Sequence, residues 1–450
     1  MAYLVGVLVI VVGLAISIAL HEIGHLVPAK KFGVRVTQYM IGFGPTLFSR
    51  RRGETEYGVK AIPLGGYIRM IGMFPPPEPD EPRPEPDEVT RRRPKTTSVW
   101  SSMANDARQA AAQEVVPGEE HRAFYRLSVP KKLAIMFGGP FMNLILAVVI
   151  LAVVISGIGL PGVSTTVASV SECVITSSQE RAECGADDPA APAFAAGVQP
   201  GDVLVSLAGE ELDTWEEFSD RIRTTPAQPT ELVVERDGEL HTLSITPMVI
   251  PREVYDADGN IQRDAAGEPI TEDVGFAGIT SQTELQRQSP LEVPVLVGDA
   301  LVRTGQVVLT LPQRMVDISK AAFGSGERDP EGPVGVVGVG RFAGEIAAVD
   351  LEGYGMVERV ADLLGILASL NLALFVFNMI PLLPLDGGHI AGALWEGLRR
   401  TIARVRRRPD PGPVDVAKAM PVAYGVFLVV AVMSVLLIYA DIVKPITLSG

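Results

Sequence analysis

The chain has 450 residues, of which 47% are hydrophobic and 20% are charged, and its formal net charge is −14. A mean hydropathy of +0.26 is too high for an ordinary soluble protein of this size, and the charged fraction is too high for a chain wholly buried in a membrane. We therefore expect membrane spans joined to at least one domain in water. The acidic balance argues against a nucleic-acid partner, which needs a basic face.

Four apolar segments are long enough to cross a lipid bilayer, which takes about 20 residues. They lie at about 3–26, 133–160, 363–383 and 420–440. The first is not preceded by basic residues, as a cleaved signal peptide would be, so we expect it to be retained. The sequence therefore predicts a polytopic α-helical membrane protein with about four transmembrane helices.

Basic clusters orient these spans. Three clusters, at 50–52, 91–93 and 131–132, lie between the first and second spans, and another, at 399–408, lies between the third and fourth. The positive-inside rule assigns both loops to the cytoplasm. The two termini and the stretch from about 161 to 355 are then predicted to face outside.

The first apolar segment ends in the sequence His-Glu-Ile-Gly-His at residues 21–25. Histidines four residues apart lie on one face of a helix and can share a zinc ion, with Glu22 placed beside its water. The alternative is a polar patch at a helix end that is satisfied by hydrogen bonds. Ionisable groups at membrane depth are costly and usually functional, which favours the metal site.

Residues 34–73 alternate short apolar runs with Gly and Pro, which predicts the strands of a hairpin sheet. Such backbone can dip into a membrane surface only where protein or a water-filled cavity covers it. The first domain is therefore predicted at 1–73, as a transmembrane helix with membrane-associated β-hairpins. Residues 74–130 are predicted to be a cytoplasmic linker, Pro- and Glu-rich and disordered over 74–98, with a regulatory docking site as the alternative. The second transmembrane helix is predicted at 131–160.

The predicted exterior stretch begins with a compact β-rich module at 161–250. Its turn at 200–201 leads into an apolar strand, Trp215 and Phe218 share one face of a helix, and a turn at 237–238 joins the last strands. Cys173 and Cys184 are the only cysteines. They are either two unrelated small residues or one disulfide of an oxidising compartment.

The rest of the exterior stretch is predicted to be a segment at 251–355. Within it, residues 290–323 are amphipathic, and we expect them to lie along the outer membrane surface. The sequence Gly-Pro-Val-Gly at 332–335 predicts a close approach of backbone to the membrane domain. The last predicted domain, at 356–450, contains the third and fourth transmembrane helices.

A catalytic zinc site normally has three protein ligands, so residues 21–25 supply only part of one. Of the other histidines, His389 is a competitor for the third position because it follows the third apolar segment closely. Asp386 is the better candidate, because an acidic residue within an apolar, proline-broken stretch needs a partner. Both halves of the site are expected near the cytoplasmic ends of their spans.

Residues 21–25 together with 378–388 resemble the site-2 protease family of intramembrane zinc metalloproteases. The order of the parts is similar to its bacterial regulator-of-sigma-E protease branch, in which an extracytoplasmic PDZ domain follows the second span. Residues 195–209 resemble a PDZ core, and the stretches at 139–143 and 332–334 resemble two further family motifs. Many members of that branch carry two PDZ domains, whereas this sequence shows one.

The resemblance implies that His21, His25 and Asp386 bind zinc and that Glu22 is the general base and then the general acid. It implies that Asn378 holds an unwound substrate backbone; a helix–helix hydrogen bond is the alternative. The same substrate-binding role extends to Pro381 in that motif and to Gly66 and Tyr67. These last two lie in the 59–70 hairpin, which would pair with the substrate as an added strand.

The expected substrates are single-pass membrane proteins cut within their membrane segment. By resemblance they are anti-sigma factors already trimmed outside, in regulated intramembrane proteolysis, or remnant signal peptides. The PDZ domain then filters by size, binds the trimmed end or serves as a spacer. The expected location is the inner (cytoplasmic) membrane of a bacterial cell, with the active site near the cytoplasmic side.

Two other classes of protein remain as alternatives. A membrane zinc transporter or sensor also buries His and Asp, but it needs no glutamate placed as a base and favours internal repeats of spans, which are not visible here. An inactive PDZ scaffold would have no use for Glu22.

Overall fold

The computed structural model describes the chain except residues 77–98, 175–183, 186–187, 226, 255–260, 265–266, 325, 327, 331, 351–353 and 448–450. Residues 77–98 of the linker predicted at 74–130, which are most of the stretch predicted to be disordered, therefore lie outside the described residues. The chain forms two compact units. One joins Met1–Gly157 to Ser289–Gly450, and the other is Ile158–Gln288.

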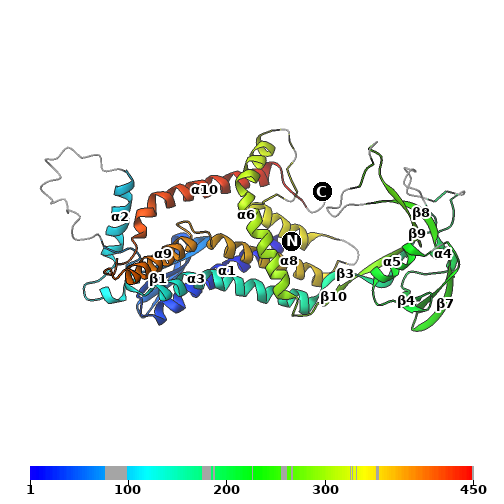
Figure 1. Cartoon of the computed structure of the whole chain (residues 1–450), viewed down its shortest axis with the longest axis horizontal. Coiled ribbons are helices and arrows are strands. Elements are labelled where there is room, and N and C mark those ends of the chain that lie inside the picture. Colours follow the sequence, from blue (N-terminus) through cyan, green and yellow to red (C-terminus); the bar gives the residue numbers. More distant parts are fainter. Residues whose placement is uncertain are drawn as a thin grey trace. The chain divides into compact units, whose positions relative to one another are not determined.

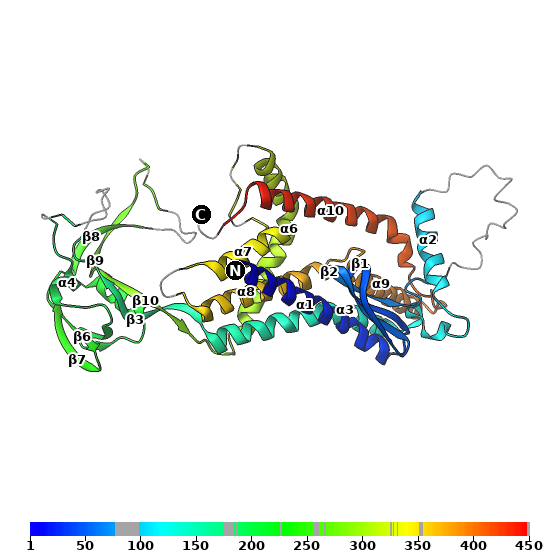
Figure 2. The ribbon, with the colours of Figure 1, turned by 180° about the vertical axis from the view of Figure 1, so that it is seen from behind.

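Long helices make up the first unit (Figures 1 and 2). In chain order they are α1 (Ala2–Lys31), α2 (Val99–Gln113), α3 (Val129–Ala152), α6 (Val293–Phe323), α7 (Val336–Ala348), α8 (Met356–Asn378), α9 (Asp386–Val405) and α10 (Met420–Val443). A π-helical segment, Val153–Ile158, extends α3, and single 3-10 turns occur at Glu120–Arg122, Phe124–Arg126 and Val416–Ala419.

Five helices among the described residues are long and apolar enough to cross a membrane, one more than the four predicted. The additional one is α6, which has the lowest mean hydropathy of the five, 1.3 against 2.1–2.8. Figures 1 and 2 show that α6 runs across the direction shared by α1, α3 and α10. Its first half packs against Ala147 of α3 and Leu372 of α8, and its second half packs against Ala440 of α10.

Glycines let the helices around α1 approach one another closely. A Cβ atom on Gly24 of α1 would lie 2.2 Å from the carbonyl oxygen of Gly138 in α3, and one on Gly138 would lie 2.1 Å from that of Gly24. Such small residues are typical of helix interfaces in membranes, where close backbone packing replaces the hydrophobic effect. The Gly24–Gly138 contact fixes α3 beside the stretch of α1 that carries the two histidines.

Strands β1 (Val36–Arg52) and β2 (Thr55–Met70) form an antiparallel hairpin with several irregularities in register. Gly66 lies opposite Ile41, and Tyr67 lies opposite Met40. The hairpin packs against α1, where the Tyr39 hydroxyl donates a hydrogen bond to the Ala19 carbonyl oxygen at 2.8 Å. This contact holds β2 beside the end of α1 that carries residues 21–25.

The Gly-Pro-Val-Gly stretch is tied to α10 by one buried carboxylate. Asp441 accepts hydrogen bonds from the backbone nitrogens of Gly335 and Gly338 at 2.9 and 2.8 Å, at the start of α7. The same carboxylate pairs with Arg328 at 2.9 Å. Because the free N–H groups of a helix start favour negative charge, Asp441 fixes α7 to the last helix of the unit.

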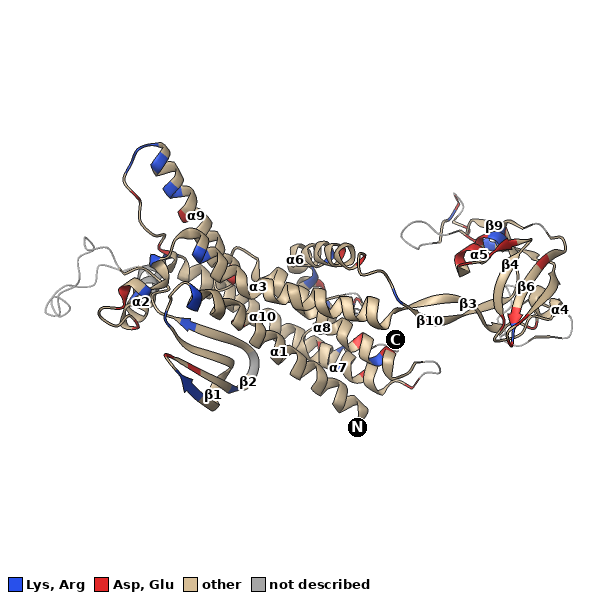
Figure 3. Cartoon of the chain, turned by 90° about the horizontal axis from the view of Figure 1, so that it is seen from below, with Lys and Arg blue, Asp and Glu red and all other residues tan. Residues whose placement is uncertain are grey.

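Positive charge gathers in one part of this unit. Figure 3 shows Lys and Arg over the β1–β2 hairpin, around α2 and along α9, whereas the middle of α1, α3 and α10 is almost free of charge. Lys and Arg thus gather around the hairpin, α2 and α9, away from the apolar middle of these helices.

The second unit is built on β-strands. Its main sheet has the order β10 (Ile279–Gln286), β3 (Leu160–Val170), β4 (Val203–Leu207), β6 (Thr230–Arg236) and β7 (Glu239–Ile245), with β5 (Glu210–Glu211) beside β4. A separate hairpin joins β8 (Met248–Glu253) to β9 (Thr271–Phe276), and the helices are α4 (Pro192–Ala196) and α5 (Trp215–Thr224). The module predicted at 161–250 thus continues in this structure to Gln288, because β10 pairs with β3.

An apolar core and a buried carboxylate paired with an arginine stabilise this unit. Phe218 and Ile222 of α5 pack on buried residues of β4 and β6 such as Leu204. Asp202, which is 1% exposed, accepts hydrogen bonds from Arg236 at 2.7 Å. Burial raises the pKa of this carboxyl, but the bonds from Arg236 and from the Gln199 backbone outweigh it and lower the pKa below its usual value.

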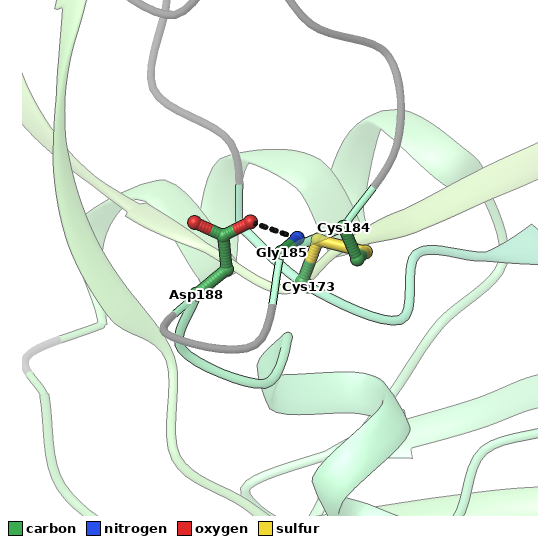
Figure 4. The surroundings of a disulfide bond; sticks show 4 residues. All are labelled: Cys173, Cys184, Gly185 and Asp188. Atoms are coloured by element: carbon green, nitrogen blue, oxygen red, sulfur yellow. Dashed lines mark hydrogen bonds between the residues drawn. A yellow bond between two sulfur atoms is a disulfide. The ribbon is translucent and has the colours of Figure 1, made fainter.

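Cys173 and Cys184 form a disulfide (Figure 4). This is the second of the two alternatives that the sequence left open. The backbone nitrogen of Gly185, next to the bridge, donates a hydrogen bond to the Asp188 carboxylate at 2.7 Å. Disulfides of this kind persist in oxidising compartments.

Candidate metal centre and active site

Three side chains from two distant parts of the chain converge at the end of α1. The Nε2 atoms of His21 and His25 are 3.2 Å apart. The Oδ2 atom of Asp386, the first residue of α9, lies 3.3 Å from each of them. Within the described residues this is the only group of three or more His, Cys, Asp or Glu side chains close enough to share a metal ion.

These distances fit a zinc ion. Zinc holds nitrogen and oxygen ligands at about 2.0–2.2 Å in a tetrahedron, which separates neighbouring ligand atoms by about 3.3 Å. Two imidazoles and one carboxylate are also a ligand set that zinc accepts, and they leave a fourth position for a water molecule or a substrate. The donor set and its spacing thus fit the metal that the sequence predicts.

A tight turn between α8 and α9 brings Asp386 to this point. α8 ends at Asn378, and the chain turns through 379–385 before α9 begins. A Cβ atom on Gly387 would lie 2.2 Å from the Ile380 carbonyl oxygen, and one on Gly388 would lie 2.6 Å from the Leu383 nitrogen. Only glycine fits at both positions, so the two glycines are what allow the turn to close behind the aspartate.

One face of α3 lies along both histidine rings. The Ile135 carbonyl oxygen accepts a hydrogen bond from His25 Nδ1 at 2.7 Å, which leaves Nε2 free to bind a metal. A Cβ atom on Gly139 would lie 2.1 Å from His25 Nε2. One turn further, the side-chain amide of Asn143 contacts His21 Nδ1 at 3.1 Å.

Sequence reasoning missed Ile135, Gly139 and Asn143 as neighbours of the candidate metal ligands. In the sequence, Gly139 and Asn143 stand out only as parts of the motif at 139–143, and their spacing alone assigns them no role. The available signal is the spacing of residues 135, 139 and 143. Residues four apart lie on one helix face, and that face of α3 covers the His21–His25 pair.

Glu22 lies beside the candidate metal ligands in a cavity of about 320 Å³. The cavity lining includes all three proposed ligands and Glu22, together with three of the predicted substrate-binding residues: Gly66, Tyr67 and Asn378. Glu22 is 7% exposed, and a Cβ atom on Gly66 would lie 3.0 Å from its Cγ atom. The missing side chain of Gly66 therefore leaves room for the glutamate.

Two residues that the sequence suggests for the site do not take the predicted place: Pro381, a substrate-binding candidate, and His389, a candidate for the third metal ligand. Pro381 is exposed and does not line this cavity, whereas Pro384, three residues further along the turn, does. His389 lines the cavity but does not belong to the group of three side chains that are close enough to share a metal ion. It lies one turn after Asp386 on α9.

A zinc-compatible cluster with an adjacent glutamate, at the end of apolar helices, defines the class of membrane-embedded zinc peptidases. The family model described as Peptidase family M50 matches residues 9–409, and the chain belongs to this family of site-2 proteases. It is accordingly an intramembrane zinc metalloprotease in a multi-pass membrane protein.

Curated relatives cover the chain along most or all of its length. Zinc metalloprotease Rip1 of Mycobacterium tuberculosis is 31% identical over 462 residues, which cover 100% of both chains. Zinc metalloprotease Rip1 of Mycolicibacterium smegmatis is 31% identical over 460 residues with the same coverage. Metalloprotease MmpA of Caulobacter vibrioides is 25% identical over 415 residues, which cover 88% of this chain and 89% of the relative.

Proposed function

We propose that His21, His25 and Asp386 hold the zinc ion of this protease and that Glu22 is its general base. The observation that carries this proposal is the mutual distance of 3.2–3.3 Å among the three ligand atoms. The substrate is a single-pass membrane protein, cut within its membrane segment. The fragment released on the cytoplasmic side is the functional product.

The chemistry divides between the metal and Glu22. When bound, zinc acts as a Lewis acid that acidifies water and polarises the scissile carbonyl group. The Glu22 carboxylate takes a proton from the attacking water and then gives it to the leaving amide nitrogen as the peptide bond breaks. Because Glu22 follows His21 directly and Gly66 leaves it room, its carboxylate is held beside the ligands while the substrate enters.

The substrate has to unwind before it is cut, because a peptide bond inside a helix is shielded by its neighbours and its carbonyl group is hydrogen-bonded. The hairpin strand β2 borders the cavity at Gly66, Tyr67 and Ile68. An extended substrate segment gains backbone hydrogen bonds by adding to such a strand. Asn378 lines the same cavity and has an amide that can bind an exposed substrate backbone.

The membrane arrangement that we propose has four spans, α1, α3, α8 and α10, with both termini outside in the inner membrane of a bacterial cell. Helix α6 is then not a span; it crosses the bundle, and its first half packs beside Ala147 of α3 and Leu372 of α8, deeper than the outer surface that the sequence predicts for it. Its five charged side chains, its low hydropathy and its direction across the other helices support this position. The gathering of positive charge around the hairpin, α2 and α9 supports a cytoplasmic location for the end that carries the active site.

The unit Ile158–Gln288 is proposed to be the extracytoplasmic PDZ domain of the branch that the sequence resembles. Its antiparallel sheet with α5 packed on the core, and its disulfide, support this assignment. It would admit substrates whose outer part is already trimmed, by size or by binding the new end. Anti-sigma factors of regulated intramembrane proteolysis are the substrate class that this order of events predicts.

Reconstitution into lipid vesicles with a single-span substrate tests the proposed function. We expect cleavage within the substrate's membrane segment, its loss on treatment with a chelator, and its return on addition of zinc. Mass spectrometry of the fragments locates the cut. Cleavage only in segments outside the bilayer, or full cleavage after zinc removal, would contradict the proposal.

We expect the cytoplasmic flank of the substrate to leave the active site through a second cavity. It has a volume of about 610 Å³, lies between β2, α2 and α10, and shares Ile68, Met70 and Met73 with the active-site cavity. We expect Ala110→Trp, which fills it from α2, to slow cleavage of a substrate with a cytoplasmic flank at least about tenfold, through misplacement of the bound segment.

The matched control is Ala112→Trp, on the same helix but outside the cavity lining. The measurement compares initial rates on substrates with long and with minimal cytoplasmic flanks. Equal effects of the two tryptophans, or an equal effect on both substrates, would show that the flank does not use this path.

A further inference from the structure

Asn143 is an unusual side chain for the middle of a membrane helix. It lies on α3, is 0% exposed, and would be costly to bury without hydrogen-bond partners. Among the described residues its amide nitrogen has one partner, Nδ1 of His21 at 3.1 Å, and its side-chain oxygen has none. The conventional reason for such a residue, a hydrogen bond between helices, leaves the oxygen unexplained.

The chemistry of a metal-bound histidine explains why Asn143 contacts His21 and why its oxygen, as placed, has no partner. An imidazole that gives Nε2 to a metal carries its proton on Nδ1 and has to donate it. The partner at Nδ1 therefore needs an acceptor, which in an asparagine is the oxygen. Rotation of the amide by 180° about its last bond exchanges its two end atoms: Oδ1 then lies at about the same distance from His21 Nδ1 and gains a donor, and the nitrogen moves to the position that the oxygen leaves.

We propose that Asn143 is a positioning residue of the metal centre, whose side-chain oxygen accepts the Nδ1–H of His21 and fixes the ring with Nε2 toward the metal. This proposal rests on the proposed role of His21 as a ligand. It makes α3 the common support of both histidines, since the Ile135 carbonyl oxygen already performs this service for His25. The two supports are eight residues apart, two turns along one helix face.

The test measures zinc affinity, by competition with a chromophoric chelator, in the purified full-length protein. Asn143→Leu keeps the volume and removes the acceptor, whereas Asn143→Asp keeps an acceptor. Loss of such a supporting bond typically weakens metal binding about 10- to 100-fold. We expect a loss of this size for Asn143→Leu and for Asn143→Ala, and an affinity close to that of the unchanged protein for Asn143→Asp.

Asn371 offers a matched control in α8. It is also 0% exposed and also has a side-chain oxygen without a partner among the described residues. Its amide nitrogen donates to Ser17 Oγ at 3.0 Å and to the Leu367 carbonyl oxygen at 2.8 Å, not to a proposed ligand. We expect Asn371→Leu to leave zinc affinity within about twofold, even where it lowers thermal stability.

A second readout is the visible absorption of the cobalt-substituted protein, which reports the geometry around the metal. We expect Asn143→Leu and Asn143→Ala to change this spectrum and Asn143→Asp and Asn371→Leu to preserve it. If Asn143→Leu does not fold, Asn143→Ala, which adds no bulk, decides the question.

Three results would overturn the proposal: unchanged zinc affinity in the acceptor-free variants, equal losses at positions 143 and 371, or a loss in Asn143→Asp as large as in Asn143→Leu. The unchanged protein is measured in parallel for zinc content and cleavage. If it binds zinc and cleaves while any of these results holds, only the role of Asn143 fails. If it holds no zinc, the proposed function itself fails.

Discussion

Replacing Glu22 with glutamine should nearly abolish proteolysis while leaving zinc in place. Glutamine has almost the same size and fits the space beside Gly66, but its amide cannot accept a proton from water. General-base catalysis contributes about 10²- to 10⁴-fold to rate, so we expect a loss of this size in kcat. Zinc content should stay at one ion per chain, because Glu22 is not one of the three ligand side chains.

The measurement pairs cleavage of a reconstituted single-span substrate with metal analysis of the same preparation. Glu22→Asp is the control variant, since it keeps the carboxylate but withdraws it by one methylene group; we expect intermediate activity. A Glu22→Gln protein that cleaves at the original rate would remove Glu22 from the mechanism. Loss of zinc together with activity would instead make Glu22 part of the metal centre.

The part of the candidate site in residues 21–25 could be predicted from the sequence, because the spacing of its two histidines along a helix decides their geometry. Residues four apart share a helix face, so His21 and His25 had to converge wherever α1 was helical. The strands at 36–70 follow in the same way from alternation and glycine. These predictions need no knowledge of how distant parts of the chain pack.

Asp386 required a different argument. Nothing in its spacing connects it to residues 21–25, and its selection depended on the cost of an acidic side chain in an apolar, proline-broken stretch. The structure brings its carboxylate to 3.3 Å from both imidazoles. The turn that does so depends on Gly387 and Gly388, whose close contacts appear only in three dimensions.

The contacts of α3 and the course of α6 could not be derived from the sequence. Asn143 and Gly139 face the histidines because Gly24 and Gly138 set the register of two helices, and sequence periodicity does not fix a register between helices. For α6, five charges on a 31-residue helix fit either a surface helix or a marginal span. Its direction across the other helices is a tertiary property.

Removal of the Asp386 carboxylate should release the metal. With Asp386→Ala, zinc would keep two imidazoles and no protein carboxylate, short of the three protein ligands that catalytic sites use. Loss of a supporting hydrogen bond already costs about 10- to 100-fold in metal affinity, so loss of a ligand should cost more than about 100-fold. Cleavage should disappear with the zinc and return only in part at high zinc concentration.

His389→Ala is the matched control for this change. His389 is a metal-capable side chain in the same cavity, one helical turn from Asp386, but outside the group of three. We expect this variant to keep its zinc, whatever it does to the cleavage rate, in equilibrium dialysis against a chelator. Zinc retained by Asp386→Ala but lost by His389→Ala would make His389 the third ligand, and the site would then be built from the other candidate that the sequence offered.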